Sequence, residues 1–192
     1  MNTTTDLPII AFVSQKDWEM WLETHHEKEQ GIWIQFFKKN SGIVSITYMQ
    51  AVETALCYGW IDSQAKSFDE KSYLQKFTPR RSKSIWSKVN TQRIERLLKE
   101  GKMKPAGLKQ IEEAKQDGRW EAAYNSPSTI IIPEDFLKEL SKNKKAQAFF
   151  ETLNKTNTYA IAWRLETAKK PETREKRMKM ILEMLGKGEK FH

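Results

Sequence analysis

The chain has 192 residues, of which 39% are hydrophobic and seven are tryptophan, and this composition argues against disorder and for one compact body. No run approaches the roughly 18–20 apolar residues of a transmembrane helix, and residues 1–12 lack the basic and apolar regions of a signal peptide. We therefore expect no transmembrane segment, a mature chain that starts at Met1, and a cytoplasmic location. The single cysteine, Cys57, excludes an internal disulfide and fits a reducing compartment.

The formal net charge of +8 is concentrated in the middle of the chain. Residues 1–60 carry 4 Lys and Arg against 7 Asp and Glu, whereas residues 61–110 carry 13 against 5. Such a positive field raises the encounter rate with polyanions such as nucleic acid, phospholipid and acidic proteins, but it selects none of them. A lysine-rich solvated surface explains the same counts.

The first predicted elements are a helix and a strand. Ser14 and Asp17 have the spacing of a capping box, which predicts a helix through about Gln30 that is ended by Gly31. Residues 31–37 are rich in β-branched and aromatic side chains and predict a strand.

A second capping box, Thr47 with Gln50, predicts a helix over residues 48–58 that ends at Gly59. We expect Val52, Ala55 and Leu56 to face the core, and Cys57 to be a small buried hydrophobe on this helix.

Two apolar-rich runs, 60–68 and 73–79, flank the polar turn 69–72 and predict a β-hairpin. We expect Phe68 to face Tyr73, which places most of the aromatic side chains of the hairpin on one face, at least partly buried. That face carries Trp60, Asp62, Gln64, Lys66, Phe68, Tyr73, Gln75 and Phe77. A slip of one residue would exchange the two faces.

Beyond Pro79 the hydrophobic pattern is helical. Helices are predicted around apolar stripes at 89–98 and 108–114, after Pro133, and at about 144–153, 157–169 and 172–186. The segment 124–132 is the predicted boundary between an N-terminal α+β part, 1–123, and a C-terminal helical part, 124–192, packed on it. We predict an α+β fold that is mostly helical, with a small antiparallel sheet made of the strand and the hairpin.

The sequence carries no recognisable reaction signature. His25 and His26 are adjacent on a helix and point about 100° apart, so they do not converge on a metal. Gly-x-Ser-x-Gly, Gly-x-Gly-x-x-Gly and phosphate-loop patterns are absent. We therefore predict no catalytic residues, no metal and no cofactor.

Candidate residues for recognition of an anion or a partner gather at the hairpin and its exit. They are Trp60, Asp62, Arg80, Arg81, Lys83, Trp86 and Lys88. In the predicted register Asp62 lies opposite Pro79, within reach of the guanidinium group of Arg80 or Arg81. One interpretation is an internal ion pair that pins the end of the hairpin and contributes little if exposed. The other is an arginine pair that binds carboxylate or phosphate in bidentate fashion beside Trp86.

Basic residues continue at helical spacing into Arg93, Arg96 and Lys99, opposite Ile94 and Leu97. This arrangement is typical of a solvated helix face, although it could extend a nucleic-acid footprint.

Several short motifs, taken in chain order, carry a resemblance to a known protein family. They are Gly31-Ile32-Trp33, Ala55-Leu56-Cys57-Tyr58-Gly59-Trp60-Ile61-Asp62, Phe77-Thr78-Pro79-Arg80-Arg81, Ser84-Ile85-Trp86-Ser87-Lys88, Met103-Lys104-Pro105-Ala106-Gly107, Asp117-Gly118-Arg119-Trp120 and Ala168-Lys169-Lys170-Pro171-Glu172-Thr173-Arg174. Over residues 15–190 the chain resembles the YdeI/OmpD-associated, or bacteriocin-protection, family. The resemblance implies no catalytic residues, and it implies a link to bacteriocin or antimicrobial-peptide tolerance and to an outer-membrane porin. Family members were described as periplasmic, and this chain departs from them because it shows no export signal.

Three functions remain open from the sequence. The first and favoured one is a non-enzymatic binding or stress-protection protein that uses the basic and aromatic hairpin surface to engage a protein or another anionic partner. The second is a nucleic-acid-binding protein that uses the basic middle region, and the third is an enzyme with a pocket near Trp60 and Asp62. The oligomeric state does not follow from the sequence.

Overall fold

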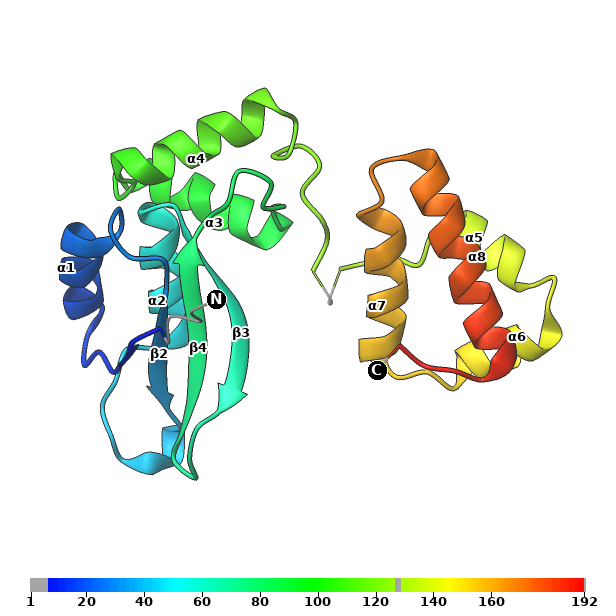
Figure 1. Cartoon of the computed structure of the whole chain (residues 1–192), viewed down its shortest axis with the longest axis horizontal. Helices are drawn as coiled ribbons and strands as arrows, with labels where there is room; N and C mark the ends of the chain where they lie inside the picture. The colour runs from blue at the N-terminus through cyan, green and yellow to red at the C-terminus, as the bar shows by residue number, and fades with distance from the viewer. Residues whose placement is uncertain (1–6, 127–128, 192) are drawn as a thin grey trace, which may run out of the picture. The chain divides into compact units, whose positions relative to one another are not determined.

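The computed structural model describes residues 7–126 and 129–191. The chain divides into two compact units, one formed by Met1–Trp86 with Asn90–Ala122 and the other by Ser87–Val89 with Ala123–His192. The described part is an α+β protein (Figure 1), as the sequence predicts. No helix in the two described ranges combines the length and the apolar character needed to cross a membrane.

A four-stranded sheet organises the first unit. The strands are β1 (Ile9–Ile10), β2 (Ile32–Phe37), β3 (Trp60–Ser67) and β4 (Ser72–Pro79), in the order β1-β2-β4-β3. Figure 1 shows β4 between β2 and β3. The expectation of an antiparallel sheet is corrected in one detail, because β1 runs parallel to β2 and the sheet is therefore mixed.

The two helices with a predicted capping box begin where that pattern predicts. The helical elements of the first unit are α1 (Gln15–His25), the 3-10 turn η1 (Lys39–Ser41), α2 (Tyr48–Cys57), α3 (Lys88–Lys99), whose first two residues fall in the second unit, and α4 (Pro105–Gln116). Both capping boxes are formed, at Ser14 and at Thr47. The predicted extension of the first helix to Gln30 is wrong, since α1 ends at His25 with His26 as its C-cap.

The predicted hairpin is present, with β3 and β4 paired in antiparallel fashion. The aromatic face is partly buried, as expected: Trp60 is 1% exposed and Phe77 is fully buried, whereas Phe68 at the turn is 50% exposed. The predicted register is wrong, because Trp60 rather than Asp62 lies opposite Pro79, and Asp62 lies opposite Phe77. An irregularity between Asp62 and Ala65 shifts the pairing, as a β-bulge does.

Trp18 occupies the centre of the first unit's core and is completely buried. Its ring nitrogen donates a 3.1 Å hydrogen bond to the carbonyl oxygen of Ala51, so this large side chain leaves no polar atom unsatisfied. Its ring contacts those of Trp60 and Phe77, which joins α1 to the sheet.

Helices α2 and α4 approach each other closely at Gly107. A Cβ atom at this position would lie 2.3 Å from the carbonyl oxygen of Cys57, so the contact requires glycine. The approach fixes the segment after α3 against the end of α2, where the main-chain N–H of Lys104 donates to the same Cys57 oxygen.

The second unit contains four helices that the sequence predicts, with shifted bounds. They are α5 (Glu134–Leu140), α6 (Lys144–Glu151), α7 (Lys155–Glu166) and α8 (Pro171–Lys187). Their apolar sides enclose a separate core of Phe136, Leu140, Ala146, Ile161, Leu165, Ile181 and Leu185. The predicted connector 124–132 includes residues 127 and 128, which lie outside the described residues.

Candidate functional site

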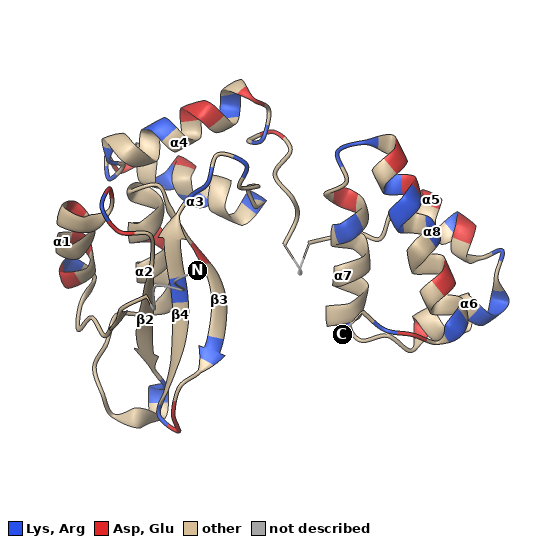
Figure 2. Cartoon of the chain, viewed as in Figure 1, with Lys and Arg blue, Asp and Glu red and all other residues tan. Residues whose placement is uncertain are grey.

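The segment Arg80–Trp86, hereafter the β4–α3 loop, connects β4 to α3 and contains most of the predicted site residues. Figure 2 shows Lys and Arg in this loop. Arg80 is only 6% exposed, and its guanidinium carbon lies 3.4 Å from the centroid of the Trp86 ring. Nη2 of Arg80 donates a 2.7 Å hydrogen bond to the carbonyl oxygen of Ile85. Arg80 and Trp86 therefore form a buried clamp that holds the loop from inside.

A second arginine, from a segment distant in the sequence, binds another carbonyl group of the same loop. Arg119 is 5% exposed, and its Nη1 donates a 3.1 Å hydrogen bond to the carbonyl oxygen of Ser84. Its Nε donates to Oδ2 of Asp117 at 2.7 Å, which compensates the buried charge. Trp120 brings its ring to 5.2 Å from that of Trp86.

The tip of the β4–α3 loop is a turn closed by two hydrogen bonds. The N–H of Ser84 donates to the carbonyl oxygen of Arg81 at 2.9 Å, and the N–H of Arg81 donates to Oγ of Ser84 at 3.0 Å. The side chains of Arg81 and Lys83 are exposed at this tip. Two buried cations, Arg80 within the loop and Arg119 outside it, thus order the backbone of the loop, and its tip presents exposed cations to solvent.

Trp60 lies in the core rather than on a surface. It is 1% exposed, and its ring nitrogen donates a 3.1 Å hydrogen bond to the carbonyl oxygen of His26. Its ring packs against those of Trp18 and Trp21. The contacts of Trp60 are those of a core residue.

Asp62 has a partner that the sequence does not indicate. The hydroxyl of Tyr48, in the first turn of α2, donates a 2.6 Å hydrogen bond to Oδ2 of Asp62. Desolvation, followed by this hydrogen bond to a carboxylate, raises the pKa of Tyr48 well above its usual value. Arg80 meets Trp86 and Asp62 meets Tyr48, so the structure divides the predicted cluster into two pairs.

Lys88, the remaining predicted site residue, is the first residue of α3 and belongs to the second unit. Its main-chain N–H donates a 2.9 Å hydrogen bond to the carbonyl oxygen of Tyr124.

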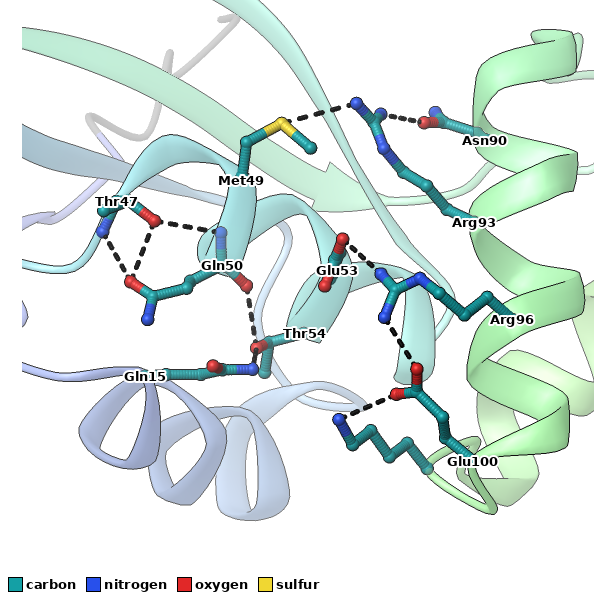
Figure 3. A network of polar contacts seen from close by, with 11 residues as sticks. Gln15, Thr47, Met49, Gln50, Glu53, Thr54, Asn90, Arg93, Arg96 and Glu100 are labelled. Carbon is teal, nitrogen blue, oxygen red and sulfur yellow. Dashed lines mark hydrogen bonds and ion pairs between the residues drawn. The ribbon is translucent and has the colours of Figure 1, made fainter.

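The predicted basic face of α3 is partly neutralised within the first unit (Figure 3). Arg93 donates to Oδ1 of Asn90 and to the sulfur of Met49. Arg96 forms ion pairs with Glu53 and Glu100. The ion pairs of Arg96 leave less free charge on the helix than its sequence implies, whereas the partners of Arg93 are neutral.

Sequence reasoning missed Arg119 and Tyr48 as contributors to this region. The signal for Arg119 was available in the segment Asp117-Gly118-Arg119-Trp120, where a glycine with positive φ turns the chain and a basic and an aromatic side chain follow. No local pattern indicates that Tyr48 reaches Asp62.

The class of protein defined by these features is an α+β protein with an ordered cationic loop and a separate helical unit. A family model described as "Domain of unknown function (DUF8412)" matches residues 10–110, and the chain belongs to this family. A model described as "Bacteriocin-protection, YdeI or OmpD-Associated" matches residues 129–188, which confirms the predicted resemblance over α5–α8 but not over the expected range of 15–190. Comparison with curated proteins and with solved structures found no match.

Proposed function

We propose that the chain is a non-enzymatic binding protein of the cytoplasm that serves in stress or bacteriocin protection and engages an anionic partner through Arg81 and Lys83. The observation that carries the proposal is the exposure of these two cations on a loop whose backbone is fixed from within by Arg80 and Arg119. An ordered loop loses little conformational freedom on binding, so more of the interaction free energy appears as affinity.

The residue types at the loop tip suit carboxylate or phosphate groups. A guanidinium group binds such planar anions through two parallel hydrogen bonds, and an ammonium group adds a mobile positive charge. The family description "Bacteriocin-protection" supports a role in protection rather than in metabolism, and it rests on the helical unit.

The test is affinity capture from native lysate with three proteins: wild type, the variant Arg81→Ala/Lys83→Ala, and the variant Lys28→Ala/Lys39→Ala. Lys28 and Lys39 are also exposed, so the control removes the same charge from another part of the first unit. We expect a partner that wild type and the control retain and the loop variant loses, with capture weakened by salt. Identical partner lists from all three proteins would contradict the proposal.

A second candidate, nucleic-acid binding, is favoured by the surroundings of Trp33. This residue alternates along β2 with the buried Ile32 and Ile34, so it belongs to the other face of the sheet. The ammonium groups of Lys66 and Lys76 lie 4.4 and 5.9 Å from its ring centroid. An indole ring beside cations suits a nucleobase and its phosphate.

The measurement for this candidate is fluorescence anisotropy with labelled single-stranded RNA and DNA at low salt. Trp33→Ala should weaken binding and Trp33→Phe should retain most of it, because stacking needs an aromatic face. No binding by wild type would remove this candidate.

A further inference from the structure

The first unit contains a crevice at the meeting point of α1, α2 and the segment between α3 and α4. We call it the Cys57 crevice, and we define it by Glu19, Glu53, Thr54, Cys57, Lys102 and Lys104. Its volume is about 280 Å³. Sites for drug-sized ligands have volumes of about 300–1,000 Å³, so this crevice suits a smaller molecule.

The floor of the crevice offers few free polar groups. Thr54 is 4% exposed, accepts a hydrogen bond from Gln15 and donates one to the carbonyl oxygen of Gln50 (Figure 3). Cys57 and Leu97 are also buried, and burial raises the pKa of the Cys57 thiol to about 11. The thiol is therefore neutral near pH 7 and acts as an apolar wall together with Leu97.

The rim of the crevice carries charges of both signs from different elements. The carboxylates come from Glu19 on α1 and Glu53 on α2, and the ammonium groups come from Lys102 and Lys104 after α3. Lys104 lies 3.2 Å from Glu19, and these side chains are 35% and 43% exposed. The other two rim charges are also paired, Glu53 with Arg96 and Lys102 with Glu100. Ion pairs at the surface contribute little to stability, so a ligand that supplies both charges can compete with them.

We propose that the Cys57 crevice binds a small zwitterion of the size of a free amino acid, whose ammonium group contacts the glutamates and whose carboxylate contacts the lysines of the rim. The apolar part of the ligand then rests on Cys57 and Leu97. This site is separate from the β4–α3 loop and goes beyond the proposed partner binding, because neither Arg81 nor Lys83 lines it.

Cys57 makes the proposal directly testable, since it is the only cysteine of the chain and lies on the crevice floor. A buried thiol of raised pKa reacts slowly, so its alkylation by excess N-ethylmaleimide, an uncharged reagent, is followed over hours by mass spectrometry of the intact protein, and a calorimetric titration of wild type measures the same binding without the label. The probes are the common α-amino acids, each at millimolar concentration. Matched probes are the N-acetyl derivative, which is only an anion, and the amide, which is only a cation.

We expect at least one amino acid to slow labelling saturably, by about tenfold at ten times its Kd, because only the unliganded fraction reacts. Its acetylated and amidated analogues should not protect the thiol. If no amino acid slows the labelling, or if the singly charged analogues slow it equally, the proposal is overturned.

Two variants test whether the ligand that protects Cys57 from alkylation binds at the rim of the crevice. Lys104→Met keeps the aliphatic stem and removes the charge, and it should abolish protection, whereas Lys109→Met on the exposed side of α4 should retain it. If Lys104→Met fails to fold, Glu19→Gln tests the opposite rim, and a calorimetric titration of wild type measures binding without the label. Protection should survive in Arg81→Ala/Lys83→Ala, and its loss there would contradict the assignment to this crevice.

Discussion

Arg80→Ala tests whether a buried guanidinium group keeps the β4–α3 loop in place. The substitution removes the 2.7 Å hydrogen bond to the carbonyl oxygen of Ile85 and the 3.4 Å contact with the Trp86 ring. A hydrogen bond to a charged group contributes about 1.5–3 kcal/mol, and a desolvated cation–π contact contributes about 2 kcal/mol. Because the two contacts share one side chain and are not additive, we expect a loss of at least about 2 kcal/mol in the free energy of unfolding.

The assay is urea unfolding followed by tryptophan fluorescence. Six of the seven tryptophans precede residue 123, so the signal reports mainly on the first unit. Arg81→Ala is the matched control, because it removes the same side chain from the neighbouring exposed position and should change stability by no more than about 0.5 kcal/mol. Arg80→Lys should fall between them, since it keeps the charge but not the planar face.

Two results would refute this reasoning. Equal losses for Arg80→Ala and Arg81→Ala would mean that burial of the guanidinium group adds nothing to stability. Full recovery by Arg80→Lys would mean that charge alone matters and that the stacking on Trp86 does not.

Three further predictions concern other parts of the chain. Gly107→Ala should destabilise the protein by about 1–3 kcal/mol in urea unfolding, because its Cβ would lie 2.3 Å from the carbonyl oxygen of Cys57. Phe136→Ala should cost about 3–5 kcal/mol and should lower hydrogen-exchange protection of α5–α8, since Phe136 is fully buried there. The hydrogen bond from Arg174 lowers the pKa of Asp135, so this carboxylate stabilises the fold above its unfolded pKa of about 3.9 and loses that effect as the pH falls through its lower folded value. The melting-temperature difference between wild type and Asp135→Asn should therefore be present at pH 7 and vanish in acid.

Local sequence patterns predicted where the helices begin because the signals are local. A capping box needs only residues three apart, and Ser14 with Asp17 and Thr47 with Gln50 satisfy it without help from the rest of the fold. The end of α1 was not predictable in this way. The ring nitrogens of His25 and His26 lie 2.8 Å from the carbonyl oxygens of Trp21 and Leu22, and the helix ends five residues before its expected limit at Gln30.

The hairpin shows the limit of strand periodicity. Alternation predicted the burial of Trp60 and Phe77 correctly, but it carries no information on where an extra residue enters a strand, and Lys66, expected on their face, lies beside Trp33 on the other face. At the turn Ser67 rather than the expected Phe68 pairs with Tyr73, and the irregularity between Asp62 and Ala65 adds a second shift of one residue, so Asp62 lies opposite Phe77 instead of Pro79. The actual partner, Tyr48, comes from a helix and not from the paired strand.

The candidate site was predicted in its residue types but not in their roles. Arg80 and Arg81 are neighbours of identical chemistry, and nothing in the local sequence distinguishes the buried one from the exposed one. The distinction arises from tertiary structure, since Trp86 supplies a ring face for one guanidinium group, and Arg119 holds the loop from 39 residues after Arg80.

Ion pairs within the fold limit what the number of basic residues implies about binding partners. Residues 61–110 carry 13 basic side chains, yet Arg96 and Lys102 pair with Glu100, and Lys104 pairs with Glu19. Charges neutralised within the fold attract a distant polyanion much less than free ones, because the field of a close ion pair falls off quickly and salt screens the remainder. Binding that depends on the number of basic side chains should therefore be weaker than the count of 13 implies, whereas binding through an ordered loop depends on the few cations it presents.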